Sequence, residues 1–197
     1  MRKVLRVPPR VVLLRVAWYR RKLMQGKHLV ERVRKAKKDF GSNPPNKFGG
    51  AAAIEILRAA LARKKILTSQ RDVFVRGVPL EVDLIVPQVG ERPSLHLVFT
   101  PGQVAVALEV KKGGTFGKPS LKMIRHDFAK LRRSGICCAY ITFEERYSYR
   151  WKATEKNIGA PCFTLAWHKY TDGPLEPTGD WERFVAFLRK AIATKQP

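Results

Sequence analysis

The chain has 197 residues, enough for one domain with an extension, and its hydrophobic content of 45% suits a globular protein with a real core. Lysine and arginine outnumber aspartate and glutamate by 39 to 16, and the resulting net charge of +23 favours a polyanionic partner, with nucleic acid first and an anionic membrane surface second. No apolar run approaches the roughly 18 residues of a membrane span, and prolines and arginines interrupt the apolar part of residues 1–21, so we expect neither a membrane span nor a signal peptide.

The N-terminal quarter is the most basic part of the chain. Residues 1–47 hold 15 lysines and arginines against only Glu31 and Asp39. The segment 28–40 has the composition of a basic helix, and the arm as a whole contains too many apolar residues for a disordered tail. Residues 41–50, GSNPPNKFGG, combine the residue types of turns and linkers. We therefore expect a basic, partly helical arm over residues 1–47 and a main domain over residues 48–197.

The pattern of the main domain predicts a mixture of helices and strands. Residues 51–66 are rich in strong helix formers. Further helices are expected over 120–135 and from Asp180 onward, and strands over 71–77, 80–87, 95–99, 104–112, 136–144 and 161–170. The apolar run 136–144 is typical of a strand that is covered on both faces. This order of elements indicates an α/β fold.

Two charged residues stand inside the strand-like stretch VALEVKKGG (106–114). Side chains at i and i+2 point to the same face of a strand, so Glu109 and Lys111 should lie side by side while Val110 points the other way. Ionised groups on an apolar strand cost free energy unless they are paired, solvated or bound to a metal. A salt bridge near the exposed end of the strand is one explanation. A catalytic edge is the other, and it needs a further acid.

A further acid stands in the earlier apolar stretch LEVDLIVP (80–87). We expect Asp83 on the face opposite Val82, Leu84 and Val86. It precedes Glu109 by 26 residues, and the strand with the Glu-x-Lys triplet is followed by a helix and a buried strand. This order, over about residues 50–145, resembles the PD-(D/E)xK nuclease superfamily with its restriction-endonuclease-like fold, although Val82 stands where many members have proline.

The resemblance implies an α/β core with a mixed central β-sheet flanked by helices, and a metal-dependent nuclease. Asp83 and Glu109, with the backbone carbonyl of Val110, would bind Mg²⁺ or alternatively Mn²⁺, which suits the preference of such ions for oxygen ligands. Lys111 would orient or deprotonate the attacking water and stabilise the transition state. Glu55 stands on the preceding helix, where many members carry a glutamate, and would add a ligand for a second metal or a water.

Each of these residues also has an ordinary explanation. Glu109 and Lys111 can form a surface ion pair, and Asp83 can form a turn at the end of a strand. An exposed glutamate on a helix, such as Glu55, is common. For Glu55 the helix also offers small neighbours that would let it lie close to a strand, namely Ala51, Ala52, Ala59 and Ala62.

Other chemically active residues have structural explanations. Cys137 and Cys138 are adjacent in an apolar run and Cys162 stands alone in another, so no C-x-x-C pair indicates a zinc site and we expect buried, reduced thiols. His126 and Asp127 suit a solvated helix face better than a general base.

Basic residues follow the Glu-x-Lys triplet and continue beyond the next strand, as a DNA-binding surface would require. The candidates are Lys112, Lys118, Lys122, Arg125, Arg146, Arg150 and Lys152. Arg146, Arg150 and Lys152 alternate with tyrosine and tryptophan in residues 144–156, a pattern that suits stacking on an unpaired base and equally suits a loop anchored by aromatic side chains.

These features predict a metal-dependent DNA endonuclease that is structure-selective or weakly sequence-specific, similar to Holliday-junction resolvases or restriction enzymes. The alternative is a non-catalytic basic nucleic-acid-binding protein with an idle nuclease-like site. DNA is the expected partner and no membrane is involved. A homodimer is one assembly that the resolvase resemblance implies. The expected location is the cytoplasm, with association to the nucleoid, or a virus or mobile element as the source.

Overall fold

The structure is a computed structural model that describes residues 9–42, 44–45, 47–91, 97–113, 117–147, 152–169 and 173–194, with the backbone alone for residues 9–23. Five α-helices and one 3-10 turn occupy the described chain: α1 (Pro9–Phe40), α2 (Phe48–Arg63), η2 (Pro101–Gln103), α3 (Lys118–Arg133), α4 (Glu155–Ile158) and α5 (Asp180–Thr194).

The strands form two sheets. The larger sheet has the order β3-β5-β6-β7-β8 and the smaller one the order β2-β1-β4. The strands are β1 (Val73–Val75), β2 (Val78–Val82), β3 (Leu84–Pro87), β4 (Val98–Phe99), β5 (Val104–Gly113), β6 (Cys137–Arg146), β7 (Cys162–His168) and β8 (Glu176–Pro177). In the larger sheet β5, β6 and β7 are parallel while β3 and β8 run antiparallel to their neighbours, so the sheet is mixed.

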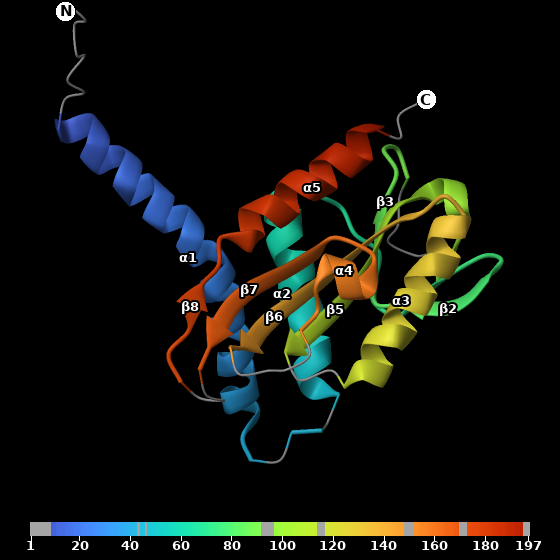
Figure 1. Cartoon of the computed structure of the whole chain (residues 1–197), viewed down its shortest axis with the longest axis horizontal. Coiled ribbons are helices and arrows are strands. Elements are labelled where there is room, and N and C mark those ends of the chain that lie inside the picture. The colour runs from blue at the N-terminus through green and yellow to red at the C-terminus, as the bar shows by residue number, and fades with distance from the viewer. Residues whose placement is uncertain are drawn as a thin grey trace, which may run out of the picture.

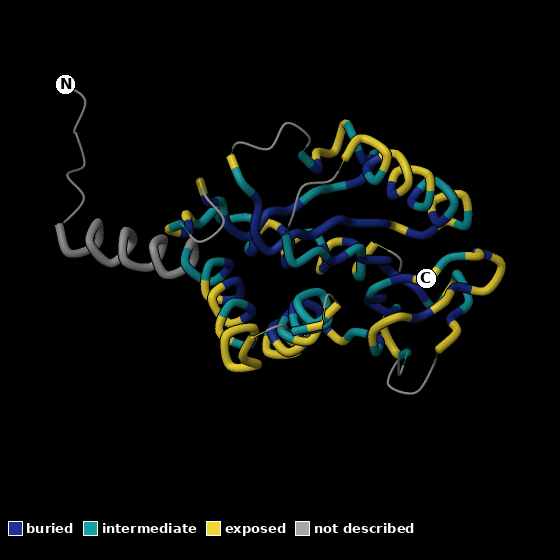
Figure 2. The backbone as a smooth tube through the Cα atoms, turned by 90° about the horizontal axis from the view of Figure 1, so that it is seen from below, coloured by how far each residue is buried: buried dark blue, intermediate teal, exposed yellow. Residues whose placement is uncertain are grey.

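The larger sheet is buried between two different layers (Figure 1). One face packs on α1, α2 and α5, with fully buried residues such as Leu57, Ile141 and Phe184. The opposite face packs on α3, α4 and the smaller sheet, with Ile85, Phe128 and Tyr140 among its buried residues. Figure 2 shows the consequence, since most of the length of the central strands is buried while the outer faces of the helices are exposed. Truncating a core residue such as Leu57 to alanine would cost about 2–5 kcal/mol.

The expected fold class is confirmed: the core is α/β, a mixed central sheet lies between helices, and the basic N-terminal extension is helical in its described part. Helix α3 and strands β5, β6 and β7 lie where the sequence pattern predicts them. Within the expected strand over 95–99, residues 95–96 lie outside the described residues, and β4 is only two residues long.

The expectation of one continuous strand over residues 80–87 is wrong. The chain bends at Asp83, so that β2 joins the smaller sheet and β3 the larger one. Val82 therefore packs in the cluster with α3, whereas Leu84 and Val86 pack in the cluster with α2 and α5. Aspartate is unfavourable inside a strand, and tertiary contacts of Asp83 hold the bend. The strand expected over 71–77 is likewise shorter, because Gly77 turns the chain with φ of 80°.

The arm is joined to the core through helix α1, which is much longer than the expected 28–40 segment. Leu29, Val30 and Val33 are buried in the same cluster as α2 and α5. Lys112 and the buried Glu144 stand on β5 and β6, which are neighbouring strands of the larger sheet.

No helix in the described part of the chain is long and apolar enough to cross a membrane. The cysteines differ partly from expectation, because Cys137 is exposed while Cys138 is buried.

Glu144 ties α1 to the sheet. Its carboxylate, 7% exposed, accepts a hydrogen bond from Arg34 Nε at 2.9 Å and lies 2.8 Å from Lys112 Nζ and 3.8 Å from His168 Nε2. Burial alone would raise the pKa of Glu144, but the hydrogen bond and charge of Lys112, followed by those of Arg34, lower it below its ordinary value. Gly113 passes so close that a Cβ there would lie 2.6 Å from the Glu144 backbone oxygen.

We predict that Glu144→Gln destabilises the full chain by about 3 kcal/mol, because it leaves two cations without their buried counter-charge. Urea denaturation at pH 7 measures this. Glu31→Gln, which removes an exposed carboxylate from α1, should change stability by less than about 0.5 kcal/mol. The pKa of Glu144 is lower in the folded than in the unfolded chain. Its contribution to the free energy of unfolding is therefore present above the ordinary carboxyl pKa and is lost as the pH falls through the pKa of the folded state. Equal stability of the two variants would contradict the role given to Glu144.

Candidate active site

Asp83 is held at the bend by the segment before β1. The Asp72 N–H donates a hydrogen bond to the Asp83 carbonyl at 3.3 Å. Ser69, fully buried, donates its N–H to the Ile85 carbonyl at 2.8 Å, and its hydroxyl accepts a hydrogen bond from the Ile85 N–H at 2.9 Å. The polar groups of Ser69 and Asp72 thus satisfy the backbone of Asp83 and Ile85, which a strand partner would otherwise do.

The Asp83 side chain reaches strand β5. Leu84 pairs with Leu108 in the antiparallel β3–β5 ladder, and continuing this register by one residue sets Asp83 opposite Glu109. The Val110 N–H donates a hydrogen bond to Asp83 Oδ2 at 2.7 Å. A backbone donor fixed in a strand therefore sets the position of this carboxylate.

Lys111 joins the two acids. Its ammonium forms a short contact with Glu109 Oε1 and lies 3.6 Å from Asp83 Oδ2. The three side chains are only partly buried, with exposed fractions of 21% for Asp83, 22% for Glu109 and 32% for Lys111. Solvent and a ligand can therefore reach them.

The charges in this group influence one another strongly. Burial, and then the charge of Asp83, raise the pKa of Glu109, although Lys111 opposes them. Burial alone would lower the pKa of Lys111, but the carboxylates of Glu109 and Asp83 raise it above its ordinary value, so the ammonium is charged at neutral pH. Two carboxylates that repel each other and share one cation form an acidic site at the surface of a strongly basic protein.

The donor set fits a magnesium ion. Mg²⁺ is commonly held by one or two carboxylates, with water filling the other positions. Asp83 and Glu109 supply two carboxylates, and the ammonium of Lys111 already contacts both of them, so the space between them accepts a positive charge. In the described part of the chain no group of three or more His, Cys, Asp or Glu side chains is arranged to hold a metal. The remaining ligands would therefore be the Val110 carbonyl and water.

Asp127, which we expected on a solvated face of its helix, also belongs to this neighbourhood. Glu109 and Asp127 line one small cavity of about 60 Å³ between β2, β5 and α3. The Asp127 charge adds to the rise in the pKa of Glu109. Asp127 itself pairs with Lys130 at 3.6 Å. In the sequence, only the position of Asp127 next to the buried Phe128 hints that Asp127 lies near Glu109, because β5 and this part of α3 are far apart in the chain.

Glu55 is not brought into this group by any hydrogen bond or ion pair among the described residues. Its carboxylate, 52% exposed, binds Arg58 Nη1 at 2.9 and 3.0 Å within helix α2. The expectation that a small-residue face near Glu55 lies against a strand is wrong. Ala59 and Ala62 are exposed, and the alanines that pack on the sheet are Ala53 and Ala60 on the other side of the helix.

The expected DNA-binding cations differ in their exposure and in their partners. Lys122 and Arg125 are exposed on α3 and make no ion pair with a described carboxylate. Lys118 is exposed at the start of the same helix, whereas Lys112 is bound to Glu144. Arg146 ends β6, half-buried. Arg150 lies outside the described residues.

Lys152 belongs to an aromatic cluster at the ends of β6 and β7. The rings of Tyr147 and Trp167 stack with centroids 5.2 Å apart, and the Lys152 ammonium lies 4.5 Å from the Trp167 centroid. The nearby Glu145 is almost fully buried and bonds to Thr164 Oγ1. Burial raises the pKa of Glu145 to about 7, against the opposing influence of Lys152. Tyr147 donates its hydroxyl to Glu176 at 2.6 Å, so its ring is anchored in the fold.

Comparison with known proteins identifies the fold. No protein-family model matches the sequence, and no curated protein matches it significantly. Among solved structures, cAAA-bound NucC of P. aeruginosa ATCC27853 superimposes with a TM-score of 0.58 at 14% identity, over 90% of each chain. The chain shares the NucC fold.

A second structure agrees. cAAA-bound NucC of E. coli MS115-1 gives a TM-score of 0.55 at 14% identity, covering 86% of this chain and 93% of that one. At this identity the similarity is one of fold, and it extends over nearly the whole chain, including most of the length outside residues 50–145. The resemblance to the PD-(D/E)xK superfamily noted in the sequence stays a proposal at this level of identity.

Proposed function

We propose that the chain is a metal-dependent endonuclease that hydrolyses phosphodiester bonds in DNA, with structure-selective or weakly sequence-specific cleavage. The observation that carries the proposal is the contact of one ammonium, that of Lys111, with the carboxylates of both Asp83 and Glu109 at the bend between the two sheets. The NucC fold supports it, because NucC is a nuclease.

Each residue of the group has a definite task in this proposal. Asp83 and Glu109 hold Mg²⁺, or Mn²⁺ in its place, together with the Val110 carbonyl, while the Val110 N–H keeps Asp83 Oδ2 oriented. The bound ion would supply Lewis-acid polarisation of the scissile phosphate and a water of lowered pKa. Ser69 and Asp72 are positioning residues, because they bind the backbone of Ile85 and Asp83 and so fix the bend.

Lys111 acts as a fixed positive charge. Its raised pKa keeps it protonated at neutral pH, where an ammonium can donate to a phosphate oxygen or to the attacking water and stabilise the negative charge of the transition state. Among the described residues Glu55 contacts only Arg58 by an ion pair, and its proposed part is limited to a water or second-metal ligand once DNA is bound.

The DNA is proposed to bind over α3 and the ends of β6 and β7. In the sequence, Lys118, Lys122 and Arg125 follow the site directly, Arg146 ends β6, and Arg150 and Lys152 come after it. Cations in this position contact phosphates irrespective of sequence, which agrees with weak specificity. A homo-oligomer in the cytoplasm, with DNA and not a membrane as the partner, completes the proposal.

We predict that Asp83→Asn and Glu109→Gln each reduce cleavage of supercoiled plasmid at least about a thousandfold, because each removes a metal ligand. DNA binding should persist or become tighter, since negative charge facing a polyanion is lost. EDTA should abolish cleavage by the unmodified chain, and added Mg²⁺ should restore it. Supercoiled, linear, single-stranded and four-way-junction DNA are compared in the same assay.

Asp39→Asn is the matched control, because it neutralises an exposed carboxylate that pairs only with Lys35 in the described chain. It should cleave like the unmodified protein. Full activity of Asp83→Asn would refute the assignment of the site. Tight DNA binding without cleavage by the unmodified chain, in Mg²⁺ and in Mn²⁺, would favour the non-catalytic nucleic-acid-binding alternative.

Lys111→Ala should lower kcat by about a hundredfold or more while changing the Kd for DNA less than about threefold, because the lysine acts on the transition state. Single-turnover cleavage and a filter-binding titration measure the two quantities. Lys35→Ala removes an exposed lysine from α1 and should leave kcat unchanged. Weak DNA binding with normal single-turnover cleavage would instead make Lys111 a phosphate-contact residue.

The double variant Lys122→Gln, Arg125→Gln should weaken DNA binding and reduce the slope of log K against log salt by up to about 1.8, or about 0.9 for each lost phosphate contact. Fluorescence anisotropy between 50 and 300 mM NaCl measures the slope. The control Arg189→Gln, Lys190→Gln removes the same charge from α5, on the opposite side of the sheet. Identical slopes for the two double variants would show that α3 is not the DNA-binding face.

A further inference from the structure

The end of strand β5, which carries Lys111, has a neighbouring strand on one side only. The antiparallel β3–β5 ladder ends at Leu108. Beyond it Lys111 and Gly113 pair with β6, opposite Thr142 and Glu144, and β6 is their only ladder partner in the described part of the chain. A segment with few ladder contacts opens more easily than the centre of a sheet, so the position of Lys111 depends on further contacts of this segment.

Lys112 supplies such a contact on the other face of the sheet. Successive side chains of a strand point to opposite faces, so Lys112 points away from Lys111 and from α3, towards α1 and α2. Its ammonium lies 2.8 Å from Oε1 of the buried Glu144 on β6. A Cβ added at Gly49, in the first turn of α2, would lie 3.1 Å from Lys112 Cδ, so the stem of the lysine packs on that helix. Lys112 therefore joins β5 to β6 and α2 directly behind the candidate active site.

Helix α1 binds the second oxygen of the same carboxylate. Arg34 Nε and Nη2 both lie 2.9 Å from Glu144 Oε2, and Arg34 Nη1 donates a hydrogen bond to the Gly173 carbonyl at 3.4 Å. One buried carboxylate thus bridges a cation of α1 and a cation of β5. Charge-assisted hydrogen bonds are strong and directional, and more so where water is excluded. The orientation of Glu144, and through it that of Lys112, therefore depends on Arg34.

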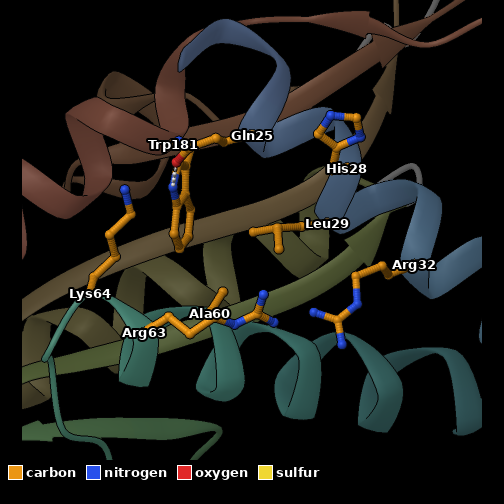
Figure 3. Close-up of a pocket in the computed structure, with 8 residues that line it drawn as sticks. All are labelled: Gln25, His28, Leu29, Arg32, Ala60, Arg63, Lys64 and Trp181. Atoms are coloured by element: carbon orange, nitrogen blue, oxygen red, sulfur yellow. Dashed lines mark hydrogen bonds between the residues drawn. The ribbon is translucent and has the colours of Figure 1, made fainter. Parts of the chain in front are cut away.

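Helix α1 is itself held firmly close to this contact. A hollow of about 300 Å³ lies between α1, α2 and α5, and Figure 3 shows the residues that line it. At its wall the Trp181 Nε1–H donates a hydrogen bond to Gln25 Oε1 at 3.0 Å, which joins α5 to α1. Leu29 and Val33 of α1 are buried in the core. Arg34 follows Gln25 by about two and a half helical turns, so the core sets its position.

We propose that Arg34, Glu144 and Lys112 are positioning residues for cleavage: they fix the end of β5 and thereby place the ammonium of Lys111 between Asp83 and Glu109. Helix α1 then contributes to catalysis through this buried ion cluster. Lys112 is assigned to the support of Lys111 and not to contact with DNA phosphates, for which the sequence pattern suggested it. This inference rests on the proposed nuclease function, because it concerns the same site.

The test compares Lys112→Met with the unmodified full chain, since methionine keeps an unbranched apolar stem and removes the ammonium. Single-turnover cleavage of supercoiled plasmid in Mg²⁺ should be at least about tenfold slower, because a small displacement of a catalytic group is costly. Fluorescence anisotropy should give a slope of log K against log salt that changes by less than about 0.3, whereas a lost phosphate contact would change it by about 0.9. Lys112→Arg keeps the charge and should cleave within about threefold of the unmodified chain.

Arg34→Gln is the second variant, because it removes the link to α1 and leaves Lys112 paired with Glu144. It should also slow cleavage without changing the salt slope. The double variant Arg34→Gln, Lys112→Met should be at most about twofold slower than Lys112→Met alone, because both cations act through one carboxylate. If circular dichroism shows that Lys112→Met is unfolded, cleavage by Arg34→Gln decides.

Val33→Ala is the matched control, since it removes two buried methyl groups from α1 and no charge. It should lower the melting temperature and still cleave within about twofold of the unmodified chain below its melting transition. Equal slowing by Val33→Ala and Lys112→Met would overturn the proposal, because the effect would then follow stability alone. Normal cleavage by Lys112→Met with a reduced salt slope would overturn it too and return Lys112 to the DNA-contact cations. Absence of cleavage by the unmodified chain would refute the proposed nuclease function itself, and this inference with it.

Discussion

The hydrogen bond from the Val110 N–H to Asp83 Oδ2 is the interaction on which the architecture of the site depends. It joins Asp83, the residue at which one apolar stretch is divided between two sheets, to strand β5, which carries Glu109 and Lys111. The bend leaves Asp83 outside both ladders, so its backbone and its carboxylate need partners from elsewhere. Asp72 and Val110 provide these partners. The acid therefore stands at a bend, where a continuous strand would have paired its backbone in one ladder.

Charge pairing explains how so basic a chain folds compactly. Acidic residues lie where cations come close to one another or to the core. Glu144 forms ion pairs with Arg34 and Lys112, and Asp83 and Glu109 both pair with Lys111. Helix α1 is held both by this ion cluster and by its buried leucine and valines. The uncompensated cations remain on outer surfaces such as that of α3, where water and a polyanion can reach them.

Much of the fold could be predicted from the sequence, because it depends on local patterns. The helical spacing of Leu121, Ile124 and Phe128 defines α3, and the continuous apolar run near residue 140 defines a strand buried on both faces. The bend at Asp83 could not be predicted, since LEVDLIVP alternates as one strand would, and only the contacts with Ser69, Asp72 and Val110 break it. The hollow between α1, α2 and α5 was equally hidden, because its lining residues extend from 25 to 181 and none has a sequence signal of its own.

Burial of the Glu145 carboxyl couples folding to the binding of a proton. Its pKa of about 7 lies above that of a carboxyl in the unfolded chain, so the folded protein holds a proton there that the unfolded one releases, and stability falls as pH rises from about 4.5 to 7. A polyanion bound beside Lys152 would raise this pKa further, because it disfavours the carboxylate. Association with such a partner would then take up a proton, and its affinity would decline as the solution passes through neutrality into the alkaline range.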